Sequence, residues 1–274
     1  MLTITDALHA QAATATQKVD SLRTPARFLV AGVLGGVYLG IGVVLMVSAA
    51  GPLVVAGDGL AKLVAGGVFG VALTLVVFAG ADLATSAMMF LPQGVLMRTT
   101  GIGPATLTLV AVFAANLLGA LAFGALILGS GLLRVESPGG AMVAAMLETK
   151  AAESPLELFI RGVLCNVLVC LAIWMGARVR SEVARIILIF AAITAFVTSS
   201  FEHVIANMAL YSIGLALGDP NASVPLFAGN LLWVGLGNLI GGGLIVGAGY
   251  WVLGGRPQVG GSAERRSTST EIAA

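Results

Sequence analysis

Three polar side chains, Glu202, His203 and Asn207, stand together inside a long apolar stretch of the sequence, residues 186–217. Ionisable and amide groups at bilayer depth are costly unless they face a partner, a cavity or water, so this cluster predicts a functional site. On a helix, His203 and Asn207 would share one face, whereas Glu202 and His203 would diverge by about 100°. An imidazole can also exchange protons near neutral pH. The alternative interpretation is a structural histidine that is hydrogen-bonded within a helix bundle.

A second polar cluster, Asp82, Thr85 and Ser86, interrupts another apolar stretch, residues 63–97. Such side chains cap helix ends, and non-helical backbone is tolerated at membrane depth only where it is buried in protein or lines a cavity. We therefore expect a loop here that borders a pore. The alternative is a kinked helix whose polar side chains are bonded to carbonyl groups of the same helix.

The apolar stretch around His203 is expected to break as well, at residues 198–200. If the two breaks meet at the middle of the bilayer, Thr85 and His203 become a polar pair inside one path. The exposed amides at the helix ends would then favour negative charge. The two clusters together predict a site for an anion.

The composition is that of an integral membrane protein. Hydrophobic residues make up 58% of the chain and charged residues only 10%, whereas a soluble domain carries about 25% charged residues. The mean hydropathy is +1.02. The net charge of +1 gives no excess of basic residues of the kind that binds nucleic acid. Cys165 and Cys170 fit no zinc pattern and are expected to pack as small apolar side chains. Because few His, Cys or carboxylate groups converge in the apolar segments, we expect no enzyme, no metal and no cofactor.

Six apolar segments are long enough to cross about 30 Å of hydrocarbon. They span residues 27–50, 63–97, 104–128, 156–177, 183–217 and 226–253. We therefore divide the chain into an amphipathic N-terminal segment (1–26), a transmembrane domain (27–253) and a polar, disordered C-terminal tail (254–274). The N-terminal segment is expected to form a surface helix and not a cleavable leader.

Basic residues accumulate on one side of an arrangement with an even number of spans, and that side is expected to be the cytoplasm. Both termini of this multi-pass protein would then be cytoplasmic. The basic residues on that side are Lys18, Arg23, Arg27, Arg98, Arg178, Arg180, Arg185, Arg256, Arg265 and Arg266.

The two halves of the chain resemble each other weakly. Residues 116–119 (Asn-Leu-Leu-Gly) match 238–241 (Asn-Leu-Ile-Gly), and 32–34 match 162–164 (both Gly-Val-Leu). The two interrupted segments also occupy corresponding positions. Because three spans per half place the halves in opposite orientations, we predict an all-α fold with six transmembrane helices in a 3+3 inverted repeat, in which the second and fifth helices are broken.

Four motifs resemble those of the formate/nitrite transporter family. They are 81–86 (Ala-Asp-Leu-x-Thr-Ser), 165–175 (Cys-Asn-x-Leu-Val-Cys-Leu-Ala-x-Trp-Met), 201–208 (Phe-Glu-His-x-Ile-Ala-Asn-Met) and 230–238 (Asn-Leu-Leu-Trp-Val-x-Leu-Gly-Asn). The run at 201–208 is the most specific, and the resemblance covers residues 27–250. It implies an aquaporin-like protomer in a homopentamer of the bacterial inner membrane, with one pore in each protomer. The expected substrates are small monovalent anions such as nitrite, formate and hydrosulfide, or the matching weak acids.

The resemblance also implies roles for individual residues. Thr85 and His203 would form the central polar pair, and two asparagines would hydrogen-bond near the pore. Lys150 would be the lysine at the periplasmic entrance that draws anions in; the alternative is a solvated loop charge that offsets Glu148 and Glu153. The implied substrate pathway contains Thr85, Lys150, Asn166, Glu202, His203 and Asn207.

Two apolar constrictions are implied, one on each side of the polar pair. They would consist of Phe69, Leu73 and Phe196 on the periplasmic side and of Leu83 and Val169 on the cytoplasmic side. The sequence departs from the family at Ala84, where many members carry a bulky phenylalanine. The cytoplasmic constriction is therefore expected to be wider or differently gated.

A bare anion in a narrow apolar passage loses its hydration at high cost, whereas a neutral weak acid loses much less. The hypothesis is that Lys150 recruits the anion and that His203 supplies or relays a proton, so that the neutral acid crosses the constriction. The expected partners are nitrite or formate, protons and the lipid bilayer.

The choice of anion depends on a few local stretches. Residues 88–91, 172–175 and 209–210 are closer to the nitrite branch of the family, and formate is the alternative. A channel for neutral solutes would carry twin Asn-Pro-Ala loops, which the sequence lacks.

Overall fold

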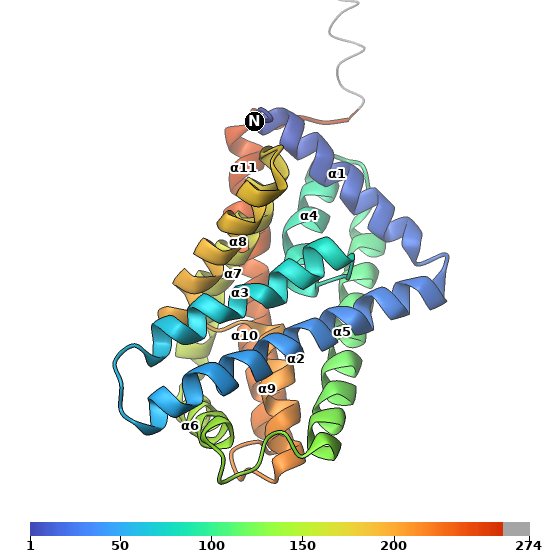
Figure 1. Cartoon of the computed structure of the whole chain (residues 1–274). Coiled ribbons are helices and arrows are strands. Elements are labelled where there is room, and N and C mark those ends of the chain that lie inside the picture. Colours follow the sequence, from blue (N-terminus) through green and yellow to red (C-terminus); the bar gives the residue numbers. More distant parts are fainter. Residues whose placement is uncertain (260–274) are drawn as a thin grey trace, which may run out of the picture.

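The structure, a computed structural model of the chain, describes residues 1–259 and consists within them of helices joined by short connections (Figure 1). The predicted all-α class is confirmed for this part of the chain. Residues 260–274 of the predicted tail lie outside the described residues. In chain order the elements are α1 (Ile4–Ser21), α2 (Pro25–Val55), α3 (Ala61–Ala79), α4 (Ala84–Leu96), α5 (Ile102–Ser130), α6 (Pro138–Ala152), α7 (Pro155–Arg178), α8 (Glu182–Thr198), α9 (Val204–Leu217), α10 (Val224–Leu239), the π-helix η1 (Ile240–Ala248) and α11 (Gly249–Leu253).

Most of the bundle is built from helices that are suited to a bilayer. Within residues 1–259, five continuous helical stretches are long and apolar enough to cross a membrane, namely α2, α3, α5, α7 and the stretch formed by α10, η1 and α11; α9 is a shorter apolar helix. Large apolar side chains face outward, for example Leu107 and Leu126 on α5 and Leu232 on α10. An exposed apolar surface of this kind requires lipid or a neighbouring subunit around it. The chain is therefore a membrane protein.

The first connection inside a long apolar segment joins α3 to α4. α3 ends at Ala79, Gly80 adopts a left-handed backbone with φ of 81°, and α4 begins at Ala84. Glycine adopts this conformation at little cost because it has no Cβ. Thr85 and Ser86 lie in the first turn of α4. Their predicted position in the loop is therefore wrong, because helical geometry resumes before them.

The second such connection joins α8 to α9. α8 ends at Thr198, Ser200 has a left-handed φ of 58°, and α9 begins at Val204. Glu202 and His203 thus precede the helix and are not part of it. The expectation that their side chains diverge by a helical angle is wrong, because the backbone of this segment is not helical.

A helix that the sequence analysis did not predict, α6, follows α5. It begins at Pro138, after Ser137, whose hydroxyl accepts a hydrogen bond from the Gly140 N–H at 3.1 Å. With 15 residues it is too short to span hydrocarbon. It packs against α2 and α9. Gly51 of α2 permits this approach, because a Cβ there would lie 2.5 Å from the Pro138 carbonyl oxygen.

Both ends of the described chain lie at one end of the bundle, next to α1 and α11, whereas α6 lies at the opposite end (Figure 1). The Leu2 N–H donates to the Arg178 carbonyl at 2.8 Å, and the Val259 N–H donates to the Met97 carbonyl at 3.2 Å. The predicted N-terminal helix is present as α1, and its buried side, which includes Leu8, packs on the bundle.

Candidate functional site

The structure brings Thr85 and His203 together, as the sequence predicts. The Thr85 hydroxyl oxygen lies 3.0 Å from the His203 Nε2 atom, and both side chains are buried. His203 is also the N-cap of α9, because its Nδ1 atom accepts a hydrogen bond from the Ala206 N–H at 3.1 Å. An Nδ1 atom that accepts carries no proton, so the neutral ring has its proton on Nε2 and donates to Thr85.

Two phenylalanines stand beside the imidazole. The Phe196 ring stacks on the His203 ring with centroids 5.9 Å apart, and the Phe69 ring meets Phe196 edge-on at 6.2 Å. Both phenylalanines are buried. An apolar wall beside the ring lowers the local dielectric constant and strengthens any electrostatic interaction that the imidazole makes.

A cavity of about 280 Å³ reaches His203 from the end of the bundle where α6 lies; we call it the α6-side cavity. Phe69 and Phe196 are part of its wall. Its polar and charged lining residues are Lys62, Thr149, Lys150, Glu153, Arg161, Ser200, Glu202, His203 and Asn207. Most of the charges in this cavity come from residues that are far apart in the sequence.

Lys150 and Glu202 form a buried ion pair in the α6-side cavity. The Lys150 ammonium lies 2.5 Å from Glu202 Oε1, and Asn207 donates to Glu202 Oε2 at 2.6 Å and to Asn230 Oδ1 at 2.8 Å. Because Lys150 belongs to α6 and only 8% of it is exposed, the alternative interpretation of a solvated loop charge is wrong. The charges compensate each other, as buried charges must.

A second cavity, of about 250 Å³, lies on the side of α1; we call it the α1-side cavity. Lys18 of α1 forms an ion pair there with Asp82 of the α3–α4 connection. Leu83 and Ser86 also line it. The Ser86 hydroxyl is buried and has no hydrogen-bond partner among the described residues. The two cavities thus have a lysine–carboxylate pair each.

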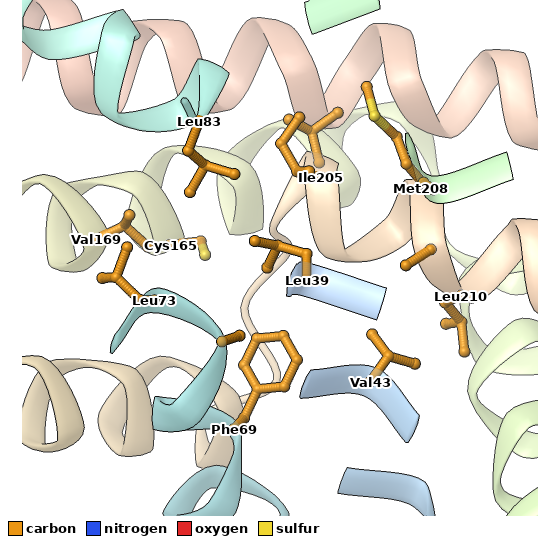
Figure 2. Packing of buried hydrophobic residues seen from close by; sticks show 14 of the residues in the cluster. Leu39, Val43, Phe69, Leu73, Leu83, Cys165, Val169, Ile205, Met208 and Leu210 are labelled. Carbon is orange, nitrogen blue, oxygen red and sulfur yellow. The ribbon is translucent and has the colours of Figure 1, made fainter. Parts of the chain in front are cut away.

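Apolar side chains from several elements pack together in the interior of the bundle (Figure 2). Leu73 of α3, Leu83 of the α3–α4 connection and Val169 of α7 belong to one buried cluster, and Figure 2 shows Leu39 and Cys165 beside them. Leu73 and Val169 line neither cavity. All three side chains are buried, and of the three only Leu83 lines the α1-side cavity.

Ala84 and Val204, the first residues of α4 and α9, are held by two asparagines in the same way. The Ala84 N–H donates to Asn116 Oδ1 and the Val204 N–H to Asn238 Oδ1, both at 2.9 Å. Ala84 is fully buried and lines neither cavity. Its predicted effect on the width of the passage stays a prediction.

The amide group of each asparagine donates to one carbonyl within the connection and to one carbonyl of a neighbouring helix, α2 or α7. The Asn116 amide donates to Gly32 at 2.7 Å and to Asp82 at 2.8 Å. The Asn238 amide donates to Gly162 at 2.7 Å and to Glu202 at 2.9 Å. Each asparagine therefore fixes one connection with three hydrogen bonds.

Asn166 links α7 to the site. Its amide donates to the Thr85 carbonyl at 3.2 Å and to the Asn238 carbonyl at 2.7 Å. Gly242 in η1 makes room for it, since a Cβ there would lie 2.5 Å from the Asn166 amide nitrogen. The predicted proximity of Asn166 to the polar pair is thus observed.

The comparisons with known proteins agree with this arrangement. The family model described as "Formate/nitrite transporter" matches residues 5–252. The nitrite transporter NirC of Escherichia coli K12 is 36% identical over 253 residues, which are 90% of this chain and 91% of that protein. The chain belongs to the formate/nitrite transporter family. The members of this family are transporters and channels, so the expectation of a protein that is not an enzyme is confirmed.

Other relatives in the family include formate channels. The formate channel FocA of Escherichia coli K12 is 32% identical over 248 residues, covering 84% of this chain and 87% of FocA. A solved structure titled "FNT family ion channel" superposes with a TM-score of 0.85 at 34% identity, over 91% of this chain and 99% of that one. A "Pentameric formate channel with formate bound" gives a TM-score of 0.72 at 27% identity, over 84% and 98% of the two chains.

Several residues of the site were not assigned by sequence reasoning. The Asn-Leu repeats at 116–119 and 238–241 contain Asn116 and Asn238, but the repeats alone do not show what these side chains bind. Glu153 and Arg161 line the α6-side cavity as an ion pair, and Lys18 pairs with Asp82 across 64 residues. Such pairs depend on tertiary contacts, so no local signal in the sequence reveals them.

Proposed function

We propose that the protein is a channel for small monovalent anions, with nitrite as its preferred substrate. The observation that carries this proposal is the buried contact between Thr85 and His203, where His203 lines the α6-side cavity and Ser86, next to Thr85, lines the α1-side cavity. A lysine in each cavity offers an anion a positive charge. The aliphatic groups between the cavities oppose the passage of a bare anion, because it would lose its hydration there.

The proposed path runs from the α6-side cavity past Phe69 and Phe196 to the polar pair, and then past Leu73, Leu83 and Val169 to the α1-side cavity. Lys150 attracts the anion, while Glu202 balances the lysine when no anion is bound. A low-dielectric site favours the neutral acid over the anion. The anion therefore crosses the aliphatic region as the acid, after it has taken up a proton.

His203 is the proposed proton donor at that step. The neutral ring has its proton on Nε2, so donation to the anion requires a proton on Nδ1 as well. This protonation requires Nδ1 to release the Ala206 N–H, a hydrogen bond worth about 1 kcal/mol, and burial of the ring also opposes the positive charge. The proton comes from water in the α6-side cavity, moves through the imidazolium to the anion, and leaves the ring neutral again.

We further propose that the fold is a 3+3 inverted repeat with a broken second and fifth transmembrane helix. The equivalent hydrogen bonds of Asn116 and Asn238 support this, because each asparagine binds the start of a short helix, one carbonyl of the connection before it and one carbonyl of a neighbouring helix. The lysine–carboxylate pairs, Lys18 with Asp82 and Lys150 with Glu202, follow the same relation. The two amino-terminal helix ends would then meet at the polar pair.

The orientation and assembly are part of the same proposal. The excess of Lys and Arg at the end of the bundle with α1 favours a cytoplasmic location of both termini in the bacterial inner membrane. The likeness to a pentameric formate channel and the exposed apolar faces of α5 and α10 support a homopentamer. The α6-side cavity would then be the periplasmic vestibule.

Formate is the second candidate substrate. The specific observation in its favour is the 32% identity to FocA, which is only slightly lower than the 36% identity to NirC. Nitrite and formate are both bent, planar anions with two terminal oxygens, so hydrogen-bond geometry alone discriminates weakly between them.

The test is anion flux in liposomes that contain the purified full-length protein, measured for nitrite and for formate across a pH series. We expect flux of both anions to rise as the pH falls, with nitrite faster at each pH, and no flux of glycerol above that of protein-free liposomes. Faster formate flux at each pH would make formate the substrate. Absence of flux for both anions would contradict the proposed channel.

A further inference from the structure

A second ion pair in the α6-side cavity has no role in the path described so far. Glu153 lies between the last residue of α6 and the N-cap of α7, and its Oε1 atom pairs with the Nη1 atom of Arg161 on α7. Only 6% of the Glu153 side chain is exposed, compared with 34% of the Arg161 side chain. Both residues line the cavity beside Lys150 and Glu202.

Only one of the two oxygens of the Glu153 carboxylate has a partner. Its Oε2 atom is buried and has no hydrogen-bond partner among residues 1–259. A buried acceptor without a partner is costly, and a charged one more so. A proton on this carboxyl group would neutralise the charge and make the unpartnered oxygen less costly. The unpartnered oxygen therefore favours the protonated form of the Glu153 carboxyl group.

The charges around Glu153 act in both directions. Glu202 from the α8–α9 connection and Glu157 on α7 disfavour its negative charge, whereas Lys150 on α6 and Arg161 favour it. Lys62 of α3 lines the same cavity and donates to Ser200 at 3.1 Å.

Burial outweighs the favourable cations. Desolvation is the largest effect and, together with Glu202, it raises the pKa of Glu153 above its ordinary value. At pH values between the pKa of Glu153 in the unfolded protein and its higher pKa in the folded protein, the folded protein therefore keeps the proton on Glu153. It loses this proton as the pH rises through the pKa of the folded protein. The cavity is lined by three cations and two carboxylates while Glu153 is ionised, and it gains one positive charge when the proton binds.

We propose that Arg161 binds the anion in the periplasmic vestibule. Ionised Glu153 pairs with the Arg161 guanidinium and blocks this binding, whereas protonated Glu153 releases it. The guanidinium offers two parallel N–H groups, which suit a planar anion with two terminal oxygens, such as nitrite or a small carboxylate. Acidification of the outer solution thus exposes a second docking point next to Lys150. This inference rests on the proposed function, because the docked anion is the transported one.

The backbone of Arg161 has a separate structural role, which the test must spare. Its carbonyl accepts the Glu202 N–H at 3.2 Å and so holds the α8–α9 connection. Substitution of the side chain leaves this bond in place. The change E153Q keeps the shape of the side chain and imitates the protonated carboxyl group.

The test is the KM of nitrite uptake by cells that lack their own nitrite and formate transporters and express the full chain. It is measured from about pH 5 to about pH 8 outside the cells, a range around the pKa values of carboxyl groups raised by burial. At the upper end, E153Q should lower KM about fivefold relative to the unaltered protein, since one neighbouring charge pair is worth up to about a factor of five. At the lower end the two proteins should have the same KM.

Three further variants separate docking from a merely structural role. R161Q should raise KM about fivefold at the acidic end, R161K should lie between, and the double variant E153Q/R161Q should behave as R161Q, because Glu153 acts through Arg161. E148Q is the matched control, since Glu148 is exposed on α6 and does not line the cavity. It should leave KM unchanged.

The inference is overturned if the ratio of the KM values of E153Q and the unaltered protein is the same at all pH values, or if E153Q lowers KM equally in the presence and absence of Arg161. In both cases uptake persists and the proposed channel stands. Absence of saturable nitrite and formate uptake in the unaltered protein would instead refute the proposed function. Should R161Q not assemble, as judged by size-exclusion chromatography in detergent, E153Q and R161K still decide the question.

Discussion

Replacement of His203 by asparagine should abolish the acid-stimulated part of nitrite flux while the protein remains folded. Asparagine is a good N-cap, so it can still accept the Ala206 N–H that His203 Nδ1 accepts at 3.1 Å. It cannot titrate, so the proton transfer is lost. General acid catalysis contributes about 100-fold or more, and we expect a loss of that order at acidic pH, measured as initial nitrite flux into proteoliposomes.

The control for this prediction is T85V, which removes the hydroxyl partner 3.0 Å from Nε2 but leaves a titratable imidazole. We expect a slower flux with the same dependence on pH. A flux of H203N that rises with acidity as steeply as that of the unaltered protein would exclude His203 as the proton donor. Its role would then be the structural one, as a hydrogen-bonded cap of α9.

Replacement of Asn238 by leucine should destabilise the folded protein strongly. Leucine has the same branched skeleton of heavy atoms but cannot form hydrogen bonds, so it leaves the Val204 N–H and the carbonyls of Gly162 and Glu202 buried without their partner. Each of the three buried unsatisfied groups costs about 1–3 kcal/mol, so the free energy of unfolding should fall by roughly 3–9 kcal/mol. The measurement is denaturant unfolding in detergent, followed by circular dichroism.

The same loss should follow from N116L, because Asn116 binds the Ala84 N–H and the carbonyls of Gly32 and Asp82 in the same way. The control is N221L in the connection between α9 and α10, a position where only the backbone N–H takes part in a hydrogen bond among the described residues. It should change stability by less than about 0.5 kcal/mol, as is usual for surface positions. Similar stability of N116L, N238L and N221L would show that the asparagines do not hold the two connections.

The polar pair of Thr85 and His203 could be predicted from the sequence, but the residues that surround it could not. The pairing of Thr85 with His203 was predictable, because polar groups in two apolar segments must find each other or water. Helix α6 was not, since a short helix of moderate hydropathy between Pro138 and Ala152 gives no strong periodic signal. The environment of Lys150 was missed with it, because its burial depends on packing of α6 against α2 and α9.

The positions of the breaks were predicted only to within about one turn. Asp82, Thr85 and Ser86 are polar, but the helix resumes at Ala84 because Asn116 binds its N–H. The partner lies 32 residues away in the chain. Local composition can therefore indicate that a break exists, whereas its exact limits depend on a tertiary hydrogen bond.

The central claim is that the transported species is electrically neutral when it crosses the aliphatic region around Leu73, Leu83 and Val169. The most direct test is the initial nitrite flux into proteoliposomes with and without a membrane potential of about 100 mV, which is worth about 2.3 kcal/mol per charge, or about 50-fold in distribution. We predict the same flux in both conditions, with acidification of the lumen as nitrous acid enters and dissociates. A flux that falls when the lumen is negative, with no change in luminal pH, would mean that the bare anion crosses and would contradict this account.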